Sequence, residues 1–389
     1  MTTVRLRPLS IVPEGEEVLV GDPETGTFVT IPAIGGLVIE ALTRGATIDE
    51  VAAEAEAAAG QPVDIPAFVA TLTELGFVDD GSRPEAAATA PIQGKRWVAG
   101  VSERVVRPLF GRVAWCCYAA IAVFCVAVFV VRPDLFPSAA RDAFPFGDIG
   151  LSAVLLVPFS MATMALHECG HWLAARAAGL RARFGVDRRM MLLVFETDLT
   201  QVWGVPRKQR YSPLLGGMAV DVVLLGALLA ASLAVDDAAV SAALAVGIYL
   251  KLAGFLWQCM VFLRTDLYAV MVNLLGCHNL WRVKTLLLRR AFGRLSAAET
   301  EELASASAAD RRAGSWFRWV WLAGFAGVLG WFALFVLPVV AVVLRWAADG
   351  MSAGPLAGRF WYCLVCAALL LGPYLLAAGL AVRERRSRT

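Results

Sequence analysis

Six long apolar stretches set the plan of the chain. They cover residues 113–131, 149–175, 213–234, 240–264, 317–344 and 360–382. A helix needs about 20 apolar residues to cross the hydrocarbon core of a bilayer, so each stretch predicts a transmembrane helix. The segments 95–112, 176–212, 264–318 and 383–389 hold 26 Lys and Arg residues, whereas the loops between them hold four. Because cytoplasmic loops carry the excess of Lys and Arg, both termini are expected in the cytoplasm.

The first 82 residues follow a different pattern, with short apolar runs between polar ones. Residues 17–31 alternate around a turn between Gly21 and Gly26, which predicts a β-hairpin. Helices are expected at 34–42, 47–59 and 65–75, the second starting with a capping box of Thr47 and Glu50 and the third ending at Gly76. A hairpin with three helices predicts a small α+β winged-helix-like cytoplasmic domain.

Composition supports a polytopic, mainly α membrane protein, since 58% of the 389 residues are hydrophobic and 17% are charged. The expected organisation is a cytoplasmic domain at 1–82, a linker at 83–112, a membrane core at 113–295, a polar cytoplasmic helix or linker at 296–316, and two C-terminal transmembrane helices with a basic tail at 317–389. Residues 1–82 hold three basic and fourteen acidic residues, a net charge of −11, whereas 83–389 have a net charge of +13. So acidic a domain would repel phosphates, which argues against nucleic acid as a partner.

Seven of the eight cysteines lie inside apolar runs, so no extracellular disulfide framework is expected. Cys363 and Cys366 form a CxxC pair. Small buried apolar side chains are the favoured interpretation of this pair, and a redox or metal pair is the alternative.

Two of the three histidines lie in the sequence His167-Glu168-Cys169-Gly170-His171. Helix positions i and i+4 share a face, so both imidazoles can bind one zinc ion while Glu168 acts as a general base on water. The motif also falls near the end of an apolar span, where ionisable side chains are costly and usually functional. By residue frequency it would arise by chance in roughly one such chain in a thousand.

A catalytic zinc site needs a third protein ligand and one open position. Asp266 is the favoured candidate, because the second and fourth spans run in the same direction and bring it to the depth of His167 and His171. His278 is the alternative. It lies further along a basic segment and is otherwise expected to be an ordinary interfacial residue.

The motif with a downstream Asp266 resembles the site-2 protease family of intramembrane zinc metallopeptidases, in its peptide zinc metalloprotease branch, over residues 113–290. The resemblance implies one Zn²⁺ per chain, held by His167, His171 and Asp266, with Glu168 catalytic. Thr265-Asp266-Leu267-Tyr268 departs from the Asp-Gly pattern of that family. Gly216 and Gly217 correspond to its Gly-rich third-helix segment, with Asp221 where Asn is usual. Close helix packing and stabilisation of an oxyanion are both open roles for these glycines.

Residues 182–203 contain a β-like run, Met190–Phe195, too short to span a bilayer. Leu193, Val194 and Phe195 are candidate substrate-binding residues, since an exposed strand edge there can hold an extended peptide. Gly216 and Gly217 are further candidates for substrate binding. A hairpin that only packs on the bundle is the alternative. Lys251 and Asp221, both within apolar spans, are expected to form a structural ion pair, with a role in the chemistry as the alternative.

The N-terminal domain resembles the PqqD-like leader-peptide recognition domain over residues 4–82, in the hairpin through Gly26–Val29, the helix after Ile34, the segment Gly45–Val51 and the segment Leu72–Val78. The resemblance implies a leader peptide bound as an added strand. A regulatory or stabilising domain without a peptide ligand is the alternative.

Together these features favour a zinc endopeptidase in the bacterial cytoplasmic membrane. It would cleave a peptide or membrane-anchored protein near the cytoplasmic face, in the maturation or export of a ribosomally made modified peptide. The alternatives are a non-proteolytic export or immunity component with a structural zinc site, and a signalling protease acting on a tethered regulator. A metal transporter fits less well, because the spans lack a path of polar ligands.

Overall fold

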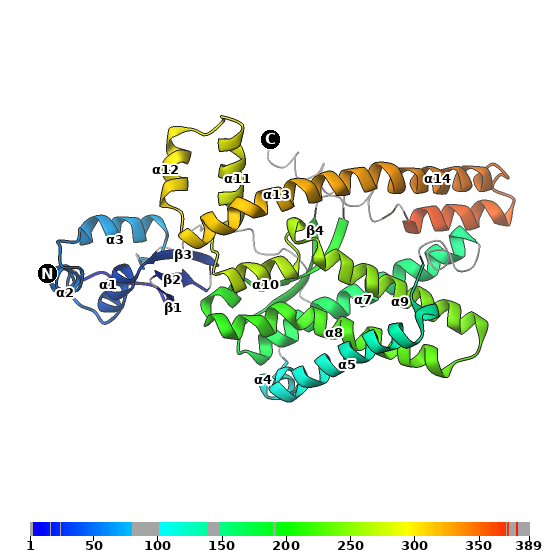
Figure 1. Cartoon of the computed structure of the whole chain (residues 1–389), viewed down its shortest axis with the longest axis horizontal. Helices are drawn as coiled ribbons and strands as arrows, with labels where there is room; N and C mark the ends of the chain where they lie inside the picture. The colour runs from blue at the N-terminus through cyan, green and yellow to red at the C-terminus, as the bar shows by residue number, and fades with distance from the viewer. Residues whose placement is uncertain are drawn as a thin grey trace.

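The computed structural model describes residues 3–15, 17–23, 25–79, 101–138, 148–189, 192–370, 372 and 379. Within these ranges the protein is mainly helical, as expected. Figure 1 shows an N-terminal head, residues 3–79, at one end of a bundle of long helices. Most of the linker predicted at 83–112 and the basic tail at 383–389 lie outside the described residues.

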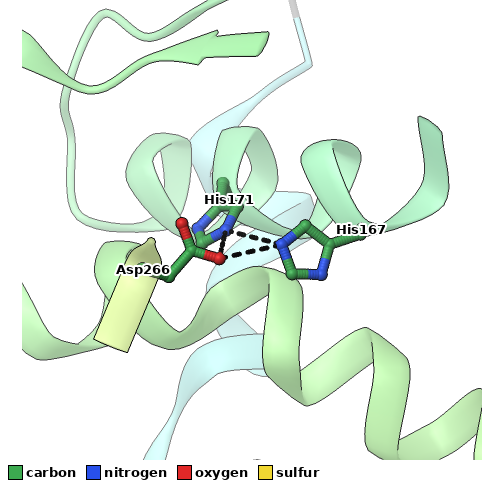
Figure 2. Close-up of side chains that lie close together, drawn as sticks. All are labelled: His167, His171 and Asp266. Atoms are coloured by element: carbon green, nitrogen blue, oxygen red, sulfur yellow. Dashed lines mark hydrogen bonds and ion pairs between the residues drawn. The ribbon is translucent and has the colours of Figure 1, made fainter. Parts of the chain in front are cut away.

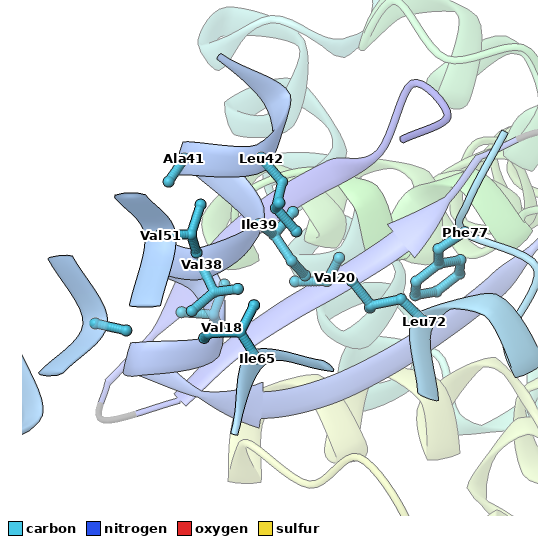
Figure 3. Packing of buried hydrophobic residues seen from close by; sticks show 11 residues of the cluster. Val18, Val20, Val38, Ile39, Ala41, Leu42, Val51, Ile65, Leu72 and Phe77 are labelled. Atoms are coloured by element: carbon cyan, nitrogen blue, oxygen red, sulfur yellow. The ribbon is translucent and has the colours of Figure 1, made fainter. Parts of the chain in front are cut away.

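The head forms its core between an antiparallel sheet and three helices (Figure 3). The strands are β1 (Ser10–Glu14), β2 (Glu17–Asp22) and β3 (Thr27–Pro32), in the order β1-β2-β3, and the helices are α1 (Ala33–Thr43), α2 (Ile48–Ala59) and α3 (Ile65–Glu74). Val18 and Val20 alternate along β2 and face the helices, where Ile39 and Phe77 are fully buried. This packing holds the opposite face of the sheet toward the helical bundle.

The hairpin and the three helices predicted for the head are confirmed. The β2–β3 pairing includes Gly21 opposite Phe28, and both sides of the capping box of Thr47 and Glu50 are present. The prediction missed β1, which pairs with β2 and contains Pro13. Proline is tolerated in an edge strand but obscures the alternating pattern that identifies a strand.

Among the described residues, five helices are long and apolar enough to cross a membrane. They are α5 (Arg112–Val131), α7 (Ile149–Ala177), α8 (Arg207–Ala234), α9 (Ala238–Cys259) and the stretch Ala308–Leu334, which begins with α13 (Ala308–Trp331). Large apolar side chains are exposed on them, including Val113, Val126 and Val130 of α5 and Leu329 of α13. Apolar surface of this extent marks a face that contacts lipid or a partner rather than water.

The two C-terminal spans differ from their predicted bounds. The span predicted at 317–344 belongs to a longer helical rod, in which α13 continues through the π-helical turn η5 (Phe332–Val336) into α14 (Leu337–Met351). The rod starts at Ala308, earlier than the predicted span. Asp310, Arg311 and Arg312 end the apolar run that the prediction followed, but they do not end the helix. Of the span predicted at 360–382, the structure describes 360–370, 372 and 379, and 360–370 belong to a short apolar helix, Gly358–Leu370.

Short elements precede or connect the long helices. They are α4 (Glu103–Val106), η1 (Arg107–Phe110), η2 (Pro133–Leu135), β4 (Arg183–Arg189), β5 (Leu192–Asp198), η3 (Thr200–Gly204), η4 (Val261–Leu263), α10 (Asp266–Leu275), α11 (Leu280–Ala291) and α12 (Ala297–Ser305). Strands β4 and β5 form an antiparallel hairpin between α7 and α8. The strand expected around Leu193, Val194 and Phe195 is therefore present, although Met190 and Met191 lie outside the described residues.

The head is fixed to the bundle by polar contacts of β1. Glu14 places Oε1 2.5 Å from Nη2 of Arg210 in α8, and Oε2 3.0 Å from Nε2 of His278, between α10 and α11. The Ser10 hydroxyl donates to the Gly204 carbonyl at 2.6 Å. Burial raises the pKa of Glu14, but its hydrogen bond with His278 and the charge of Arg210 outweigh burial, so the pKa lies below its ordinary value of 4.5.

Candidate metal centre

Two histidines of α7 and an aspartate about 100 residues further along the chain converge within the helical bundle (Figure 2). His167 Nε2 lies 2.9 Å and His171 Nε2 3.1 Å from the same oxygen, Oδ2 of Asp266, and the two Nε2 atoms lie 3.1 Å apart. The histidines are buried and Asp266 is partly buried. Among the described residues, this is the one group of three or more His, Cys, Asp or Glu placed closely enough to hold a metal ion.

The local structure explains why these three residues meet. His167 and His171 are four residues apart on α7, so they project from one face of that helix. Asp266 is the first residue of α10, after a sharp change of direction in which Arg264 adopts a left-handed conformation, with φ of 61°. Gln258, near the end of α9, accepts the backbone N–H of Asp266 at 3.0 Å and orients the start of α10.

Each histidine is held by its second ring nitrogen. Nδ1 of His171 lies 2.8 Å from the carbonyl oxygen of Pro213, and Nδ1 of His167 lies 2.7 Å from Oδ2 of Asp221. Since a carbonyl and a carboxylate only accept, Nδ1 carries the proton in both rings. Both Nε2 lone pairs then point toward Asp266.

This geometry fits a bound cation. Two imidazole lone pairs and a carboxylate oxygen are three acceptors that cannot donate to one another, an arrangement that a shared positive ion stabilises. The side-chain amide Nε2 of Gln258 lies 3.5 Å from Nε2 of His167. Two nitrogens and one oxygen are ligands that zinc accepts in catalytic sites, with a fourth position open. Donors about 2.0–2.1 Å from a tetrahedral zinc ion are about 3.3 Å apart, so the distances of 2.9–3.1 Å require only small outward shifts.

The two glycines of α8 have different roles. A Cβ atom on Gly217 would lie 2.5 Å from Nε2 of both His167 and His171, so Gly217 lines the metal centre itself. A Cβ on Gly216 would lie 2.5 Å from the carbonyl oxygen of Gly170 in α7. Gly216 therefore allows α7 and α8 to pack closely, which is the packing interpretation of the glycine segment. Only Gly217 faces the site.

Glu168 is held by the β-hairpin. The backbone N–H of Thr197 in β5 donates to Glu168 Oε2 at 2.9 Å, and the Thr197 hydroxyl donates to the Glu168 carbonyl at 2.8 Å. The N–H groups of alternate residues in a strand point the same way, so those of Leu193 and Phe195 face the same edge of β5 as that of Thr197. Backbone donors therefore line an edge that leads to Glu168, with Val194 between two of them.

The ion pair expected between Asp221 and Lys251 is present. Lys251 Nζ donates to Oδ1 of Asp221 at 2.7 Å, and both residues are buried. The sequence prediction missed the contact of Asp221 with His167, and also missed Gln258. Gln258 is polar at the end of an apolar span and only eight residues before Asp266, a signal that points to it in retrospect.

His278 is not part of the centre, because its Nε2 pairs with Glu14 of the head. The structure therefore does not bring His278 to the other two histidines, and Asp266 lies where a third ligand would be. Cys277 beside it is buried, and burial raises the pKa of its thiol to about 12. Cys363 and Cys366 are also buried, and neither forms a disulfide. They have the environment of small apolar side chains.

No family model, curated protein or solved structure matches the chain. The interpretation of the metal centre therefore depends on its own residues and their geometry.

Proposed function

We propose that the protein is a membrane-embedded zinc endopeptidase. The observation that carries this proposal is the convergence of His167, His171 and Asp266, next to a glutamate that follows the first histidine directly. Two histidines and a carboxylate with a neighbouring glutamate are the donor and base set of zinc hydrolases. The five apolar helices support a location in a membrane.

The residues of the metal centre have different roles in peptide hydrolysis. His167, His171 and Asp266 hold the ion, which when bound polarises a scissile carbonyl and acidifies water. Glu168 accepts a proton from the attacking water and passes it to the departing amine. Gly217 leaves the space beside the histidine nitrogens open, because any larger residue would fill it.

The substrate is a peptide or a membrane-anchored protein in an extended conformation. A helical substrate hides its peptide bonds in its own hydrogen bonds, so the scissile region has to unwind. The edge of β5, with the N–H groups of Leu193 and Phe195, offers backbone partners for such a strand and leads to Glu168 through Thr197. This arrangement favours substrate binding by strand addition to β5. The alternative, in which the β4–β5 hairpin only packs on the bundle, is less well supported.

Cleavage is proposed near the cytoplasmic face of a bacterial membrane, with both termini in the cytoplasm. The excess of Lys and Arg in the segments on the side of the metal centre supports this orientation. The acidic head lies on the same side and is the proposed recruiting element, with a leader peptide as its ligand and maturation of a modified peptide as the process. A tethered regulator is the alternative substrate.

Glu168→Gln tests the proposal without knowledge of the substrate. Membranes of cells that produce the wild type or Glu168→Gln are compared by labelling the new N-termini of proteins and peptides. Removal of a general base lowers the rate by about 10²–10⁴-fold, so N-termini formed with the wild type should be missing with the variant.

The purified variant should still bind as much zinc as the wild type, because Glu168 is not among the three donors. Identical N-termini in both samples, with zinc bound in both, would mean that the zinc is structural and would contradict the proposal. That result would favour a non-proteolytic export or immunity component.

A further inference from the structure

The buried carboxylate of Asp221 contacts two groups at once. Its Oδ2 lies 2.7 Å from Nδ1 of His167 on α7, and its Oδ1 accepts from Nζ of Lys251 on α9, also at 2.7 Å. Asp221 and Lys251 are 5% and 6% exposed, so water does not replace either partner. One carboxylate on α8 therefore joins three helices at the metal centre.

An ion pair that only held α8 to α9 would use Oδ1 of Asp221 and would not need its second oxygen, Oδ2. Here that oxygen is directed at a metal ligand. Asp221 follows Gly217 by four residues, so both lie on the face of α8 that meets α7. Gly217 lies against the Nε2 side of the His167 ring while Asp221 bonds its Nδ1 side. Helix α8 thus determines both the position and the rotation of this ring.

We infer that Asp221, neutralised by Lys251, is a positioning residue that holds His167 in its metal-binding tautomer and orientation. This inference rests on the metal centre of the proposed function but not on peptide hydrolysis. A carboxylate accepts the Nδ1–H proton and cannot donate, so the lone pair of His167 stays on Nε2, toward His171 and Asp266. Carboxylates in this place fix the ring and make the imidazole a stronger ligand.

Lys251 has a separate role, because its positive charge offsets the free-energy cost of burying the Asp221 carboxylate. A charge within an apolar bundle is costly unless it is paired, and Nζ of Lys251 supplies the opposite charge on the side of Asp221 away from His167. Replacing one member of a buried pair is strongly destabilising, whereas replacing both by apolar residues is often neutral. This difference separates a structural role from a positioning role.

The test measures zinc affinity by competition with a chromophoric chelator, and thermal unfolding of the zinc-free protein, on the purified full-length chain. Asp221→Asn can donate from its amide to Nδ1 and allow the wrong tautomer, so zinc affinity should fall about 10–100-fold. Lys251→Met should lower the unfolding temperature. The double variant Asp221→Leu/Lys251→Met should unfold near the wild-type temperature and still bind zinc about 10–100-fold more weakly.

Asp310→Asn is the matched control, because Asp310 is also a buried carboxylate but accepts from the backbone of His278 and Asn279, away from the metal centre. It should keep wild-type zinc affinity even if it unfolds earlier. Wild-type zinc affinity in the double variant would overturn the inference while leaving the zinc site intact. A wild-type protein that binds no zinc would overturn both the inference and the proposed function.

Discussion

At the scale of single residues, adjacent glycines on α8 serve different purposes. Gly216 lies against the backbone of α7, whereas Gly217 lies against the two donor nitrogens. A methyl group added at Gly216 therefore tests the packing of the helices, whereas a methyl group added at Gly217 tests access to the metal centre.

Gly217→Ala should weaken zinc binding by about tenfold or more, because its Cβ would lie 2.5 Å from Nε2 of both histidines. Gly216→Ala should instead destabilise the fold by about 1–3 kcal/mol through the contact with Gly170. Zinc titration and thermal unfolding of the two variants check this, with Gly254→Ala as the control, since no atom lies within 4 Å of its added Cβ. Equal zinc affinity in all three variants would contradict the placement of Gly217.

The residues of the centre differ in how far the sequence reveals them. His167, Glu168 and His171 form a local motif, and Asp266 follows from the directions of the spans. The carbonyl of Pro213 has no side-chain signal, so its bond with His171 is invisible before the fold is known. The role of Asp221 was also hidden, because one acid and one lysine in neighbouring apolar spans predict their pairing with each other and not a third partner.

At the scale of elements, the docking of β1 onto the bundle depends on Glu14. Its carboxylate pairs with buried Arg210 and with His278. Glu14→Gln leaves Arg210 without its charged partner, and loss of one member of a buried pair costs about 3–5 kcal/mol. The amides of β1 should then exchange with deuterium faster in the full-length protein, while Glu40→Gln, on an exposed face of α1, should leave them unchanged.

The same contact predicts a pH dependence. The pKa of Glu14 is lowered in the folded protein from its ordinary value of 4.5, so the unfolded chain binds a proton more readily. The contribution of Glu14 to docking is therefore full above about pH 4.5 and is lost as the pH falls through its lowered folded pKa. Protection factors of the β1 amides in wild type and Glu14→Gln should converge on acidification. A difference that stays constant down to pH 3 would contradict this assignment.

The sequence predicted elements best where one periodicity continued over many residues. The four spans from α5 to α9 and the helices of the head follow such patterns. Strand β1 is short and contains Pro13, and its pairing with β2 is seen only in the folded structure. The start of α13 was placed too late because a charged first turn ends an apolar run but not a helix.

At the scale of the whole molecule, the head and the metal centre are linked through short elements. The head contacts η3 through Ser10 and through the carbonyl of Pro23, which accepts from Gln201. Helix η3 starts three residues after Thr197, which bonds Glu168. Composition could predict an acidic head and a basic bundle, but the docking surface joins residues nearly 200 positions apart and depends on tertiary structure.

The central claim is that His167, His171 and the distant Asp266 bind one zinc ion, and the zinc content of the purified full-length protein tests it most directly. Elemental analysis should find about one zinc per chain in the wild type and in His278→Ala, which removes the histidine that lies outside the centre. Asp266→Ala should retain little zinc after dialysis against a weak chelator. A wild-type protein without zinc, or an Asp266→Ala variant that keeps as much zinc as the wild type, would contradict the account.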